Sequence, residues 1–165
     1  MNKAILLIGG NLGDRTNHLK QAVEQIALLV GKVEKTSALY ETAAWGVMEQ
    51  PDYLNQGLLV TTEMDAITLL HTVLEIERNI GRIRQQKWGA RIIDIDIIFY
   101  NDAVINLPEL KIPHPQLQNR QFVLVPLQEI IPAWIHPVLH KDINTLLARC
   151  ADPLPARKFI PAVVH

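Results

Sequence analysis

The sequence is poor in cysteine, carries almost no net charge and contains no long apolar run. Cys150 is its single cysteine, which excludes an intramolecular disulfide and a cysteine-rich zinc cluster and is compatible with a reducing compartment. The formal net charge of -1 gives no general attraction to nucleic acid or to an anionic membrane surface. The first apolar run breaks at Gly9 and Gly10, well short of a signal peptide or a membrane span. We therefore expect a soluble, cytoplasmic protein.

The length of the chain limits its domain organisation. With 165 residues and a hydrophobic fraction of 48%, the chain can bury a substantial core in one domain and is too short for two to be expected. We expect a single domain over 1–165 and a monomer. The tail over 151–165 contains Pro153, Pro155 and Pro161, and we expect it to be loosely held.

Hydrophobic periodicity indicates an alternation of strands and helices, followed by a hairpin. An Asp65 N-cap and a stripe of Leu69, Val73 and Ile76, ended by Gly81, are typical of an amphipathic helix. The same reasoning predicts strands over 4–8, 33–40, 54–64, 92–99, 104–106 and 122–127, and helices over 19–30, 66–80 and 143–149. The expected fold class is α/β (α+β), a single-domain ferredoxin-like sandwich whose mixed or antiparallel sheet is covered by helices.

The stretch RIIDIDIIFY over 91–100 places two acids in an otherwise apolar strand. Because side chains alternate along a strand, Asp94 and Asp96 should share one face, with Ile93, Ile95, Ile97 and Phe99 on the other. Two neighbouring carboxylates repel each other and are costly to desolvate, so a bound cation is expected. Magnesium fits, because it binds through one or two carboxylates together with nucleotide phosphates. The alternative is a half-exposed strand whose acids simply face solvent.

A basic segment lies directly before the two acids. It contains Arg82, Arg84, Lys87 and Arg91, and Gly81 and Gly89 are candidate hinges. Carboxylates for a metal beside guanidinium groups for phosphate are the combination that phosphoryl transfer requires. Taken alone, the segment is better explained as a solvated basic loop.

Three other features are weaker indications of a ligand-binding site. His114 lies between Pro113 and Pro115, which restrict the backbone and would aim its imidazole, and Arg120 follows. Glu77 lies close to the apolar stripe of its helix and could face a ligand. The GGNLGD loop over 9–14 could present backbone N–H groups, but it matches neither the P-loop nor the dinucleotide fingerprint. No nucleophile–histidine arrangement is supported, so covalent catalysis is not expected.

Several segments together resemble one family, the 6-hydroxymethyl-7,8-dihydropterin pyrophosphokinases of folate biosynthesis. The matching pieces occur in the order of the family and span most of the chain: GGNLGDR (9–15), LYETAAWG (39–46), QPDYLN (50–55), EIERNIGRIR (75–84), KWGARIIDIDIIFY (87–100) and PHPQLQNRQFVLVPL (113–127). The resemblance implies an enzyme that transfers the pyrophosphoryl group of ATP to the hydroxymethyl oxygen of a reduced pterin, with AMP as the second product. Its partners would be these small molecules, not nucleic acid or a membrane.

The resemblance also implies roles for individual residues. The catalytic residues would be Arg82, Arg91, Asp94 and Asp96, with the two aspartates holding two Mg²⁺ ions. ATP, the co-substrate, would contact Glu77, Arg84, Trp88, His114 and Arg120. The pterin would be bound by Thr42, Trp45, Tyr53, Asn55 and Phe122, with the rings of Tyr53 and Phe122 on its faces and the amide of Asn55 at its polar edge. The basic loop over 82–91 would close over the nucleotide.

The chain departs from the usual family pattern at Gly10, Leu74, Ala90, Ile92 and Gln116. These positions avoid the two acids and the expected pterin contacts, so they bear on nucleotide affinity and loop dynamics more than on the reaction. Two alternatives remain at this point. One is another magnesium-dependent nucleotidyl or phosphoryl transferase, and the other is a non-catalytic module that binds pterin or nucleotide.

Overall fold

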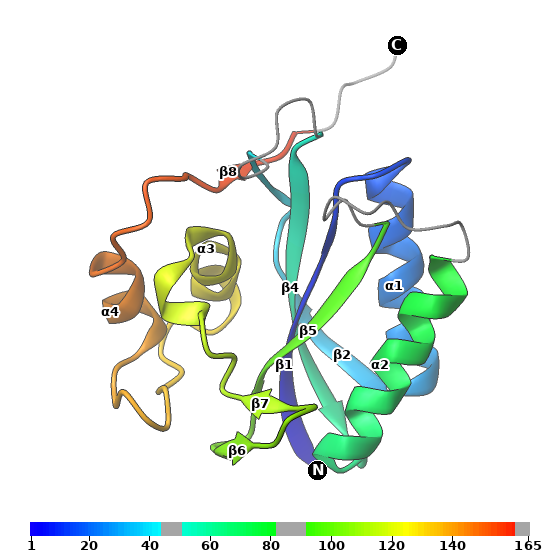
Figure 1. Cartoon of the computed structure of the whole chain (residues 1–165), viewed down its shortest axis with the longest axis horizontal. Coiled ribbons are helices and arrows are strands. Elements are labelled where there is room, and N and C mark those ends of the chain that lie inside the picture. Colours follow the sequence, from blue (N-terminus) through cyan, green and yellow to red (C-terminus); the bar gives the residue numbers. More distant parts are fainter. Residues whose placement is uncertain (44–50, 82–91, 161–165) are drawn as a thin grey trace.

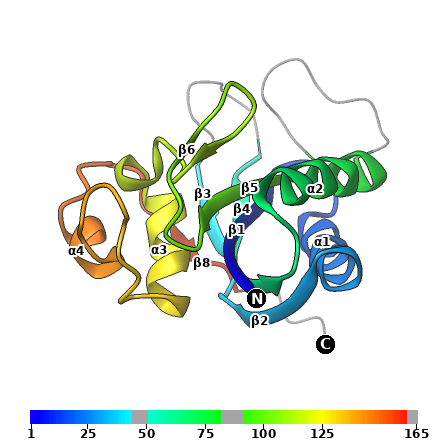
Figure 2. The ribbon, with the colours of Figure 1, turned by 90° about the horizontal axis from the view of Figure 1, so that it is seen from below.

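The computed structural model describes residues 1–43, 51–81 and 92–160. Within them a central sheet separates two layers of helices, with α1 and α2 on one face and α3 and α4 on the other (Figures 1 and 2). The elements, in chain order, are β1 (Asn2–Gly10), α1 (Arg15–Leu29), β2 (Gly31–Thr36), β3 (Tyr40–Thr42), β4 (Tyr53–Thr62), α2 (Ala66–Ile80), β5 (Asp94–Tyr100), β6 (Ile105–Asn106), β7 (Lys111–Ile112), the 3₁₀ turn η1 (Leu117–Asn119), α3 (Gln121–Ile130), α4 (Ile143–Ala148) and β8 (Arg157–Lys158).

The central sheet is antiparallel and has β5 at one edge. Its strand order is β5-β1-β4-β3-β8, and β2 also pairs with β4. The short strands β6 and β7 form a separate ribbon. This arrangement confirms the expected class, an α/β sandwich whose sheet is covered by helices.

Alternation along the strands builds two cores, one on each face of the sheet. Leu6 and Ile8 of β1 pack in the cluster that contains Leu69 and Val73 of α2. Leu7 lies between them in sequence and belongs to the opposite cluster, under α3. Because neighbouring side chains point to opposite faces, one strand supplies both cores. The central strands are therefore apolar on both sides.

An irregularity in β5 changes the face on which its second half packs. Leu6 pairs with Ile97 but Ile5 pairs with Phe99, so Ile98 is an extra residue in β5. Phe99 consequently lies in the cluster under α3, with its ring 5.8 Å from that of Trp134. The expectation that Phe99 shares a face with Ile95 and Ile97 was wrong, because a one-residue insertion reverses the alternation that follows.

The stretch over 122–127 was predicted as a strand and is part of helix α3. Its buried residues Val123, Leu124, Leu127 and Ile130 recur at helical spacing once the window extends beyond Leu127. A short apolar run with aromatic and β-branched residues does not distinguish the two structures by itself. The helix lies against Gly57 of β4, where the absence of a side chain leaves room for Leu127.

Three other expectations are corrected in detail. The predicted strand over 33–40 is divided into β2 and β3, which both pair with β4. The short strand after Asn101 pairs with β7 and not with β5, so no hairpin forms there with β5. The described part of the proline-containing tail is attached to the sheet, because β8 pairs with β3 and the Phe159 N–H donates to the Leu39 carbonyl at 2.8 Å.

We predict that Phe99→Ala lowers the free energy of unfolding by about 3–5 kcal/mol, because it leaves a cavity in the core under α3. Urea denaturation monitored by circular dichroism measures this change. Leu139→Ala, at a side chain that is 39% exposed, serves as the control and should change the value by less than about 0.5 kcal/mol. Equal effects of the two substitutions would contradict the assignment of Phe99 to this core.

Candidate active site

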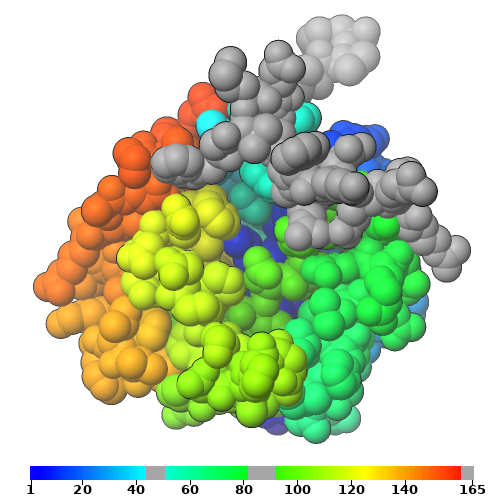
Figure 3. Space-filling model, in the orientation of Figure 1, coloured from blue at the N-terminus to red at the C-terminus, as the bar shows by residue number. Residues whose placement is uncertain are grey.

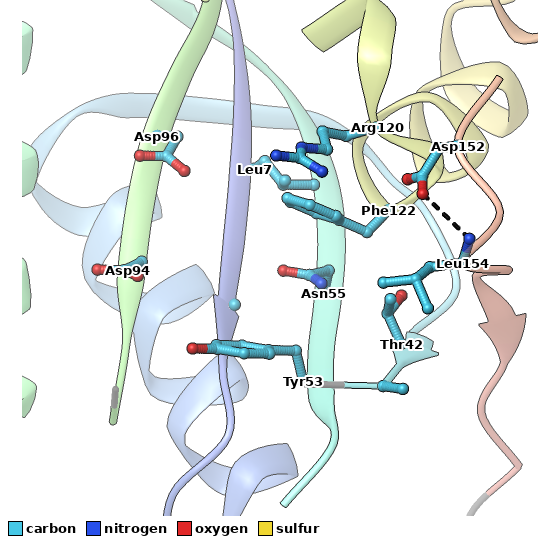
Figure 4. Close-up of a pocket in the computed structure, with 12 residues that line it drawn as sticks. Leu7, Thr42, Tyr53, Asn55, Asp94, Asp96, Arg120, Phe122, Asp152 and Leu154 are labelled. Atoms are coloured by element: carbon cyan, nitrogen blue, oxygen red, sulfur yellow. Dashed lines mark hydrogen bonds between the residues drawn. The ribbon is translucent and has the colours of Figure 1, made fainter. Parts of the chain in front are cut away.

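Asp94 and Asp96 project from the same face of the edge strand β5 (Figure 4). In the β1–β5 register, Asp94 stands opposite Gly9 and Asp96 opposite Leu7. This face is the one covered by α3 farther along the sheet, while Ile95 and Ile97 are buried against α2. The predicted separation of the acids from these two isoleucines is therefore present, and the acids themselves lie where the α3 layer leaves the sheet open.

Desolvation raises the pKa of Asp96 above the ordinary aspartate value. The side chain is exposed to solvent on one side, but the surrounding protein removes part of the hydration that its charged form needs. Its ionised form is therefore costly without a cation nearby. A carboxylate in this situation is suited to bind a hard, positively charged ligand.

The two acids lie where two cavities meet. Both acids line a cavity of about 340 Å³ between β1, β4 and the start of α3, and they also line a second one of about 510 Å³ beside α2. In the space-filling view, a hollow opens between α3 and α2 with β1 and β5 at its floor (Figure 3). Ligands in the two cavities would reach the acids from opposite sides.

The first cavity combines aromatic walls with polar groups at its floor. The rings of Tyr53 and Phe122 lie on either side of Asn55 (Figure 4). The Thr42 side chain lies beyond them, and its buried hydroxyl oxygen has no hydrogen-bond partner among the described residues. A buried polar atom without a partner is uncommon and indicates a missing donor or acceptor. The cavity is thus suited to a flat ring with a polar edge.

Gly9 allows the Asn55 side chain to reach into this cavity. Asn55 is 6% exposed and stands opposite Gly9 in the antiparallel register of β1 and β4. A Cβ atom at residue 9 would collide with the Asn55 side-chain oxygen and would also lie close to the Leu54 carbonyl. The glycine is required here by close approach, because the amide occupies the space that a side chain would need.

The second cavity is apolar at α2 and polar toward β7 and the loop that follows it. Its α2 side is formed by Leu70, Leu74 and Glu77, and its other residues are Ile95, Ile97, Glu109, Leu110, Lys111, His114 and Pro115 together with the two acids. Burial lowers the pKa of His114, so its imidazole is neutral near pH 7. The backbone N–H of His114 donates a hydrogen bond to the Ile98 carbonyl at 3.0 Å, which holds the segment over 113–115 against β5.

Glu77 fixes the strand that carries the acids. Its Oε2 accepts the Ile95 N–H at 2.6 Å. Ile95 lies between the two aspartates on an edge strand, where a backbone N–H directed away from β1 has no neighbouring strand to accept it. Glu77 therefore supports the geometry of the acid pair as well as lining the second cavity.

The GGNLGDR segment forms hydrogen bonds with the residues directly before β4, the strand that begins with Tyr53. The Asn11 side-chain amide donates to the Pro51 carbonyl at 3.1 Å. One Arg15 nitrogen, Nη1, donates to Glu41 Oε2 at 2.7 Å and to the Asp52 carbonyl at 2.9 Å. These contacts were not foreseen, because nothing in the sequence indicates which distant carbonyls the motif would meet. The segment therefore positions one wall of the first cavity.

The structure brings together most of the described residues that the sequence singled out. Thr42, Tyr53, Asn55, Arg120 and Phe122 line the first cavity with the acids. Glu77 and His114 line the second. Trp45, Arg82, Arg84, Trp88 and Arg91 lie outside the described residues. Sequence reasoning assigned no site role to Leu7, Gly9, Ala43, Asp152 and Leu154, which also line the first cavity. Gly9 and Ala43 lie in quoted motifs and Leu7 in a predicted strand, whereas no motif or periodicity marked Asp152 and Leu154.

Two features of the described residues bear on the class of protein. No group of three or more histidine, cysteine, aspartate or glutamate side chains is arranged to hold a metal there, so Asp94 and Asp96 form a site of two carboxylates only. No described helix is long and apolar enough to cross a membrane. A pair of carboxylates supplies hard oxygen ligands, which suit a divalent cation that bridges phosphate oxygens.

Comparison with known proteins identifies the family. Residues 5–132 match the model of the 7,8-dihydro-6-hydroxymethylpterin-pyrophosphokinase family. The chain belongs to this family, and the resemblance inferred from its motifs is confirmed, together with the class of enzyme, a pyrophosphokinase.

Individual relatives agree with this assignment. The chain is 43% identical over 145 residues to the 2-amino-4-hydroxy-6-hydroxymethyldihydropteridine pyrophosphokinase of Synechocystis, covering 87% of this chain and 74% of that protein. It is 39% identical over 156 residues to the enzyme of the same name from Aquifex aeolicus, covering 91% and 97%. The fold is similar to the crystal structure of wild-type HPPK-DHPS from Plasmodium falciparum, with a TM-score of 0.74 and 20% identity over 90% of this chain and 43% of that one.

We predict that Gly9→Ala displaces the Asn55 side chain and lowers the free energy of unfolding by about 1–3 kcal/mol, the usual cost of overpacking a filled site. The side-chain amide resonances of Asn55 in a ¹H–¹⁵N spectrum report the displacement, and urea denaturation reports the stability. Gly57→Ala is the control for the Asn55 resonances, because a Cβ there would meet side-chain atoms of α3 at 3.3–3.5 Å and not the Asn55 side chain. Unchanged Asn55 resonances in Gly9→Ala would refute the close approach.

Proposed function

We propose that Asp94 and Asp96 hold the magnesium at which this chain transfers pyrophosphate from ATP, bound beside α2, to a pterin bound between Tyr53 and Phe122. The overall reaction is that of the family: ATP and 6-hydroxymethyl-7,8-dihydropterin give AMP and the pyrophosphorylated pterin, in folate biosynthesis. The observation that carries the proposal is that the acid pair lines both cavities.

The acid pair fits magnesium by its chemistry. Its two carboxylates lie on one face of a strand and supply hard oxygen ligands, and desolvation raises the pKa of Asp96. A site of two carboxylates leaves the remaining coordination positions to water and phosphate oxygens, as in other nucleotide sites. We propose two Mg²⁺ ions, which would neutralise the triphosphate and polarise the transferred group.

The first cavity fits the pterin. The faces of Tyr53 and Phe122 would stack on the bicyclic ring, and the Asn55 amide and the Thr42 hydroxyl would meet its polar edge. With the ring held in this way, its hydroxymethyl group would face Asp94 and Asp96 across β1. The protein then contributes mainly orientation, because phosphoryl transfer needs alignment of the attacking and leaving oxygens more than it needs covalent chemistry.

The second cavity fits the nucleotide. Leu70 and Leu74 offer an apolar wall for the base, and Lys111 and His114 offer donors at the opposite wall. Glu77, next to the acids, would contact ATP while it accepts the Ile95 N–H. Arg120 lines the first cavity, with its guanidinium beside the Phe122 ring and directed toward Leu7 (Figure 4), a position suited to phosphate oxygens passing between the cavities.

Roles outside the described residues complete the proposal. Arg82 and Arg91 would neutralise charge on the transferred group, Arg84 and Trp88 would contact ATP, and Trp45 would contact the pterin, as the motifs of the family imply. A monomer in the cytoplasm, working on small molecules and not on nucleic acid or a membrane, remains part of the proposal. Light scattering after size-exclusion chromatography tests the monomer.

Product analysis tests the reaction. We expect the protein, incubated with ATP, Mg²⁺ and 6-hydroxymethyl-7,8-dihydropterin, to form AMP and a pyrophosphorylated pterin in equal amounts, and to form neither when EDTA is present. Chromatography with mass detection separates AMP, ADP, free pyrophosphate and the pterin species. ADP with a singly phosphorylated pterin, or free pyrophosphate without a pterin product, would replace this function by another phosphoryl or nucleotidyl transfer.

We predict that Asp94→Ala and Asp96→Ala each lower kcat by roughly 10²-fold or more, because each removes charge stabilisation at the reacting phosphate. Asp102→Ala, at an exposed turn after β5, is the matched control and should keep full activity. The circular dichroism spectra of all three variants should match that of the unsubstituted protein. Full activity in either of the first two variants would exclude the metal assignment.

A further inference from the structure

The segment that follows Cys150 forms part of the first cavity. Asp152 and Leu154 line it together with Thr42, Asn55 and Phe122. Both lie beyond the residues that match the family model, which end at residue 132. This wall is therefore outside the part of the chain that the family model covers.

Leu154 closes the end of the cavity that is farthest from the acids. The acids belong to β5 at one edge of the central sheet, and Leu154 precedes β8 at the other edge. Its side chain points inward, toward Asn55 and above Thr42, on the side of these residues away from β5 (Figure 4). If a ring lies between Tyr53 and Phe122 and its reactive group faces the acids, the opposite end of the ring contacts Leu154.

Asp152 holds this leucine in place. Its Oδ1 accepts the Leu154 N–H at 3.0 Å, and its Oδ2 accepts the Gln121 N–H at 3.0 Å. The Asp152 carbonyl also accepts a hydrogen bond from the Gln121 side-chain amide at 2.6 Å. Since each carboxylate oxygen already accepts a backbone N–H, Asp152 connects Leu154 to the first residue of α3, directly before Phe122.

The chain beyond Leu154 is fixed as well. Arg157 and Lys158 pair with β3, and the Phe159 N–H donates to the Leu39 carbonyl at 2.8 Å. The Arg15 guanidinium lies over the Phe159 ring, 5.4 Å from its centroid, a favourable cation–π geometry. Leu154 is thus held between two attached points, and its position in the cavity is set by the fold.

We propose that Leu154 is a specificity-determining residue that packs against the end of the pterin ring opposite the hydroxymethyl group, and that Asp152 is its positioning residue. The inference rests on the proposed function, because it takes the pterin to be the ligand of this cavity. An apolar side chain at this end removes ring surface from water and limits the length of ligand that fits. Dihydropterins that carry a substituent at this end of the ring are therefore rejected.

Calorimetric titration with 6-hydroxymethyl-7,8-dihydropterin tests the role of Leu154. Leu154→Ala should weaken pterin affinity about 10-fold, since it removes much of the apolar surface that the ring covers. It should leave the affinity for ATP and Mg²⁺ within about twofold, and Leu154→Met should keep most of the pterin affinity. The control is Leu139→Ala, at an exposed leucine outside both cavities, and should leave both affinities unchanged.

A ligand with a methyl group on the exocyclic amine of the pyrimidine ring tests the limit on length. The quantity measured is the affinity for the methylated ligand divided by the affinity for the unmethylated pterin. This ratio should be at least about fivefold higher in Leu154→Ala than in the unsubstituted protein, because the substitution removes the atoms that occupy the space of the methyl group. The same relative affinity in both proteins would overturn the proposal, as would an unchanged pterin affinity in Leu154→Ala.

Asp152→Asn tests the positioning role, because it removes one of the two carboxylate acceptors. It should weaken pterin binding about threefold alone and add no further loss in the Leu154→Ala background. Additive losses would show that Asp152 does not act through Leu154. If the unsubstituted protein neither binds nor converts the pterin, the proposed function fails and this inference fails with it; if it does both while Leu154→Ala is unaffected, only the inference fails.

Discussion

The arrangement of the site depends on the alternation of side chains along β5. One strand buries Ile95 and Ile97 against α2 and projects Asp94 and Asp96 to the other face. A shift of one residue would turn the carboxylates into the core, where their desolvation would be prohibitive. The register with β1 and the bond from the Ile95 N–H to Glu77 both resist such a shift. The same contacts that stabilise an edge strand therefore also align the acids.

The extra residue at Ile98 lets this strand serve two different purposes along its length. Before it, the face toward α3 carries the acids and remains open. After it, the same face carries Phe99, which fills the core with Trp134. Without the insertion, strict alternation would place Phe99 on the α2 face and leave a gap beneath α3. The irregularity thus separates the half of β5 that carries the two acids from the half that supports the fold.

The sequence predicted those parts of the molecule that local rules determine. The Asp65 cap and the apolar stripe of α2 follow from spacing within one helix, and the shared face of Asp94 and Asp96 follows from alternation between neighbours. The insertion at Ile98, the helical state of 122–127 and the contribution of Leu154 depend on what lies opposite in the fold. No pattern within a few residues encodes that partner, so tertiary contacts decided these features. The residue roles implied by the family motifs remain predictions for the same reason.

The positions of the two cavities explain why the acids are best placed at the junction and not inside either cavity. An ionised pair enclosed by apolar walls would lose its hydration and destabilise the fold, whereas at the junction it stays partly solvated, although desolvation already raises the pKa of Asp96. A cation and phosphate oxygens would replace that remaining water with ligands of the appropriate charge. Binding would then relieve the electrostatic cost of keeping the two carboxylates ionised, so nucleotide and metal should stabilise the native state through mass action. Under the proposed function, the stability of the fold and the binding of metal and nucleotide would be coupled through the same pair of carboxylates.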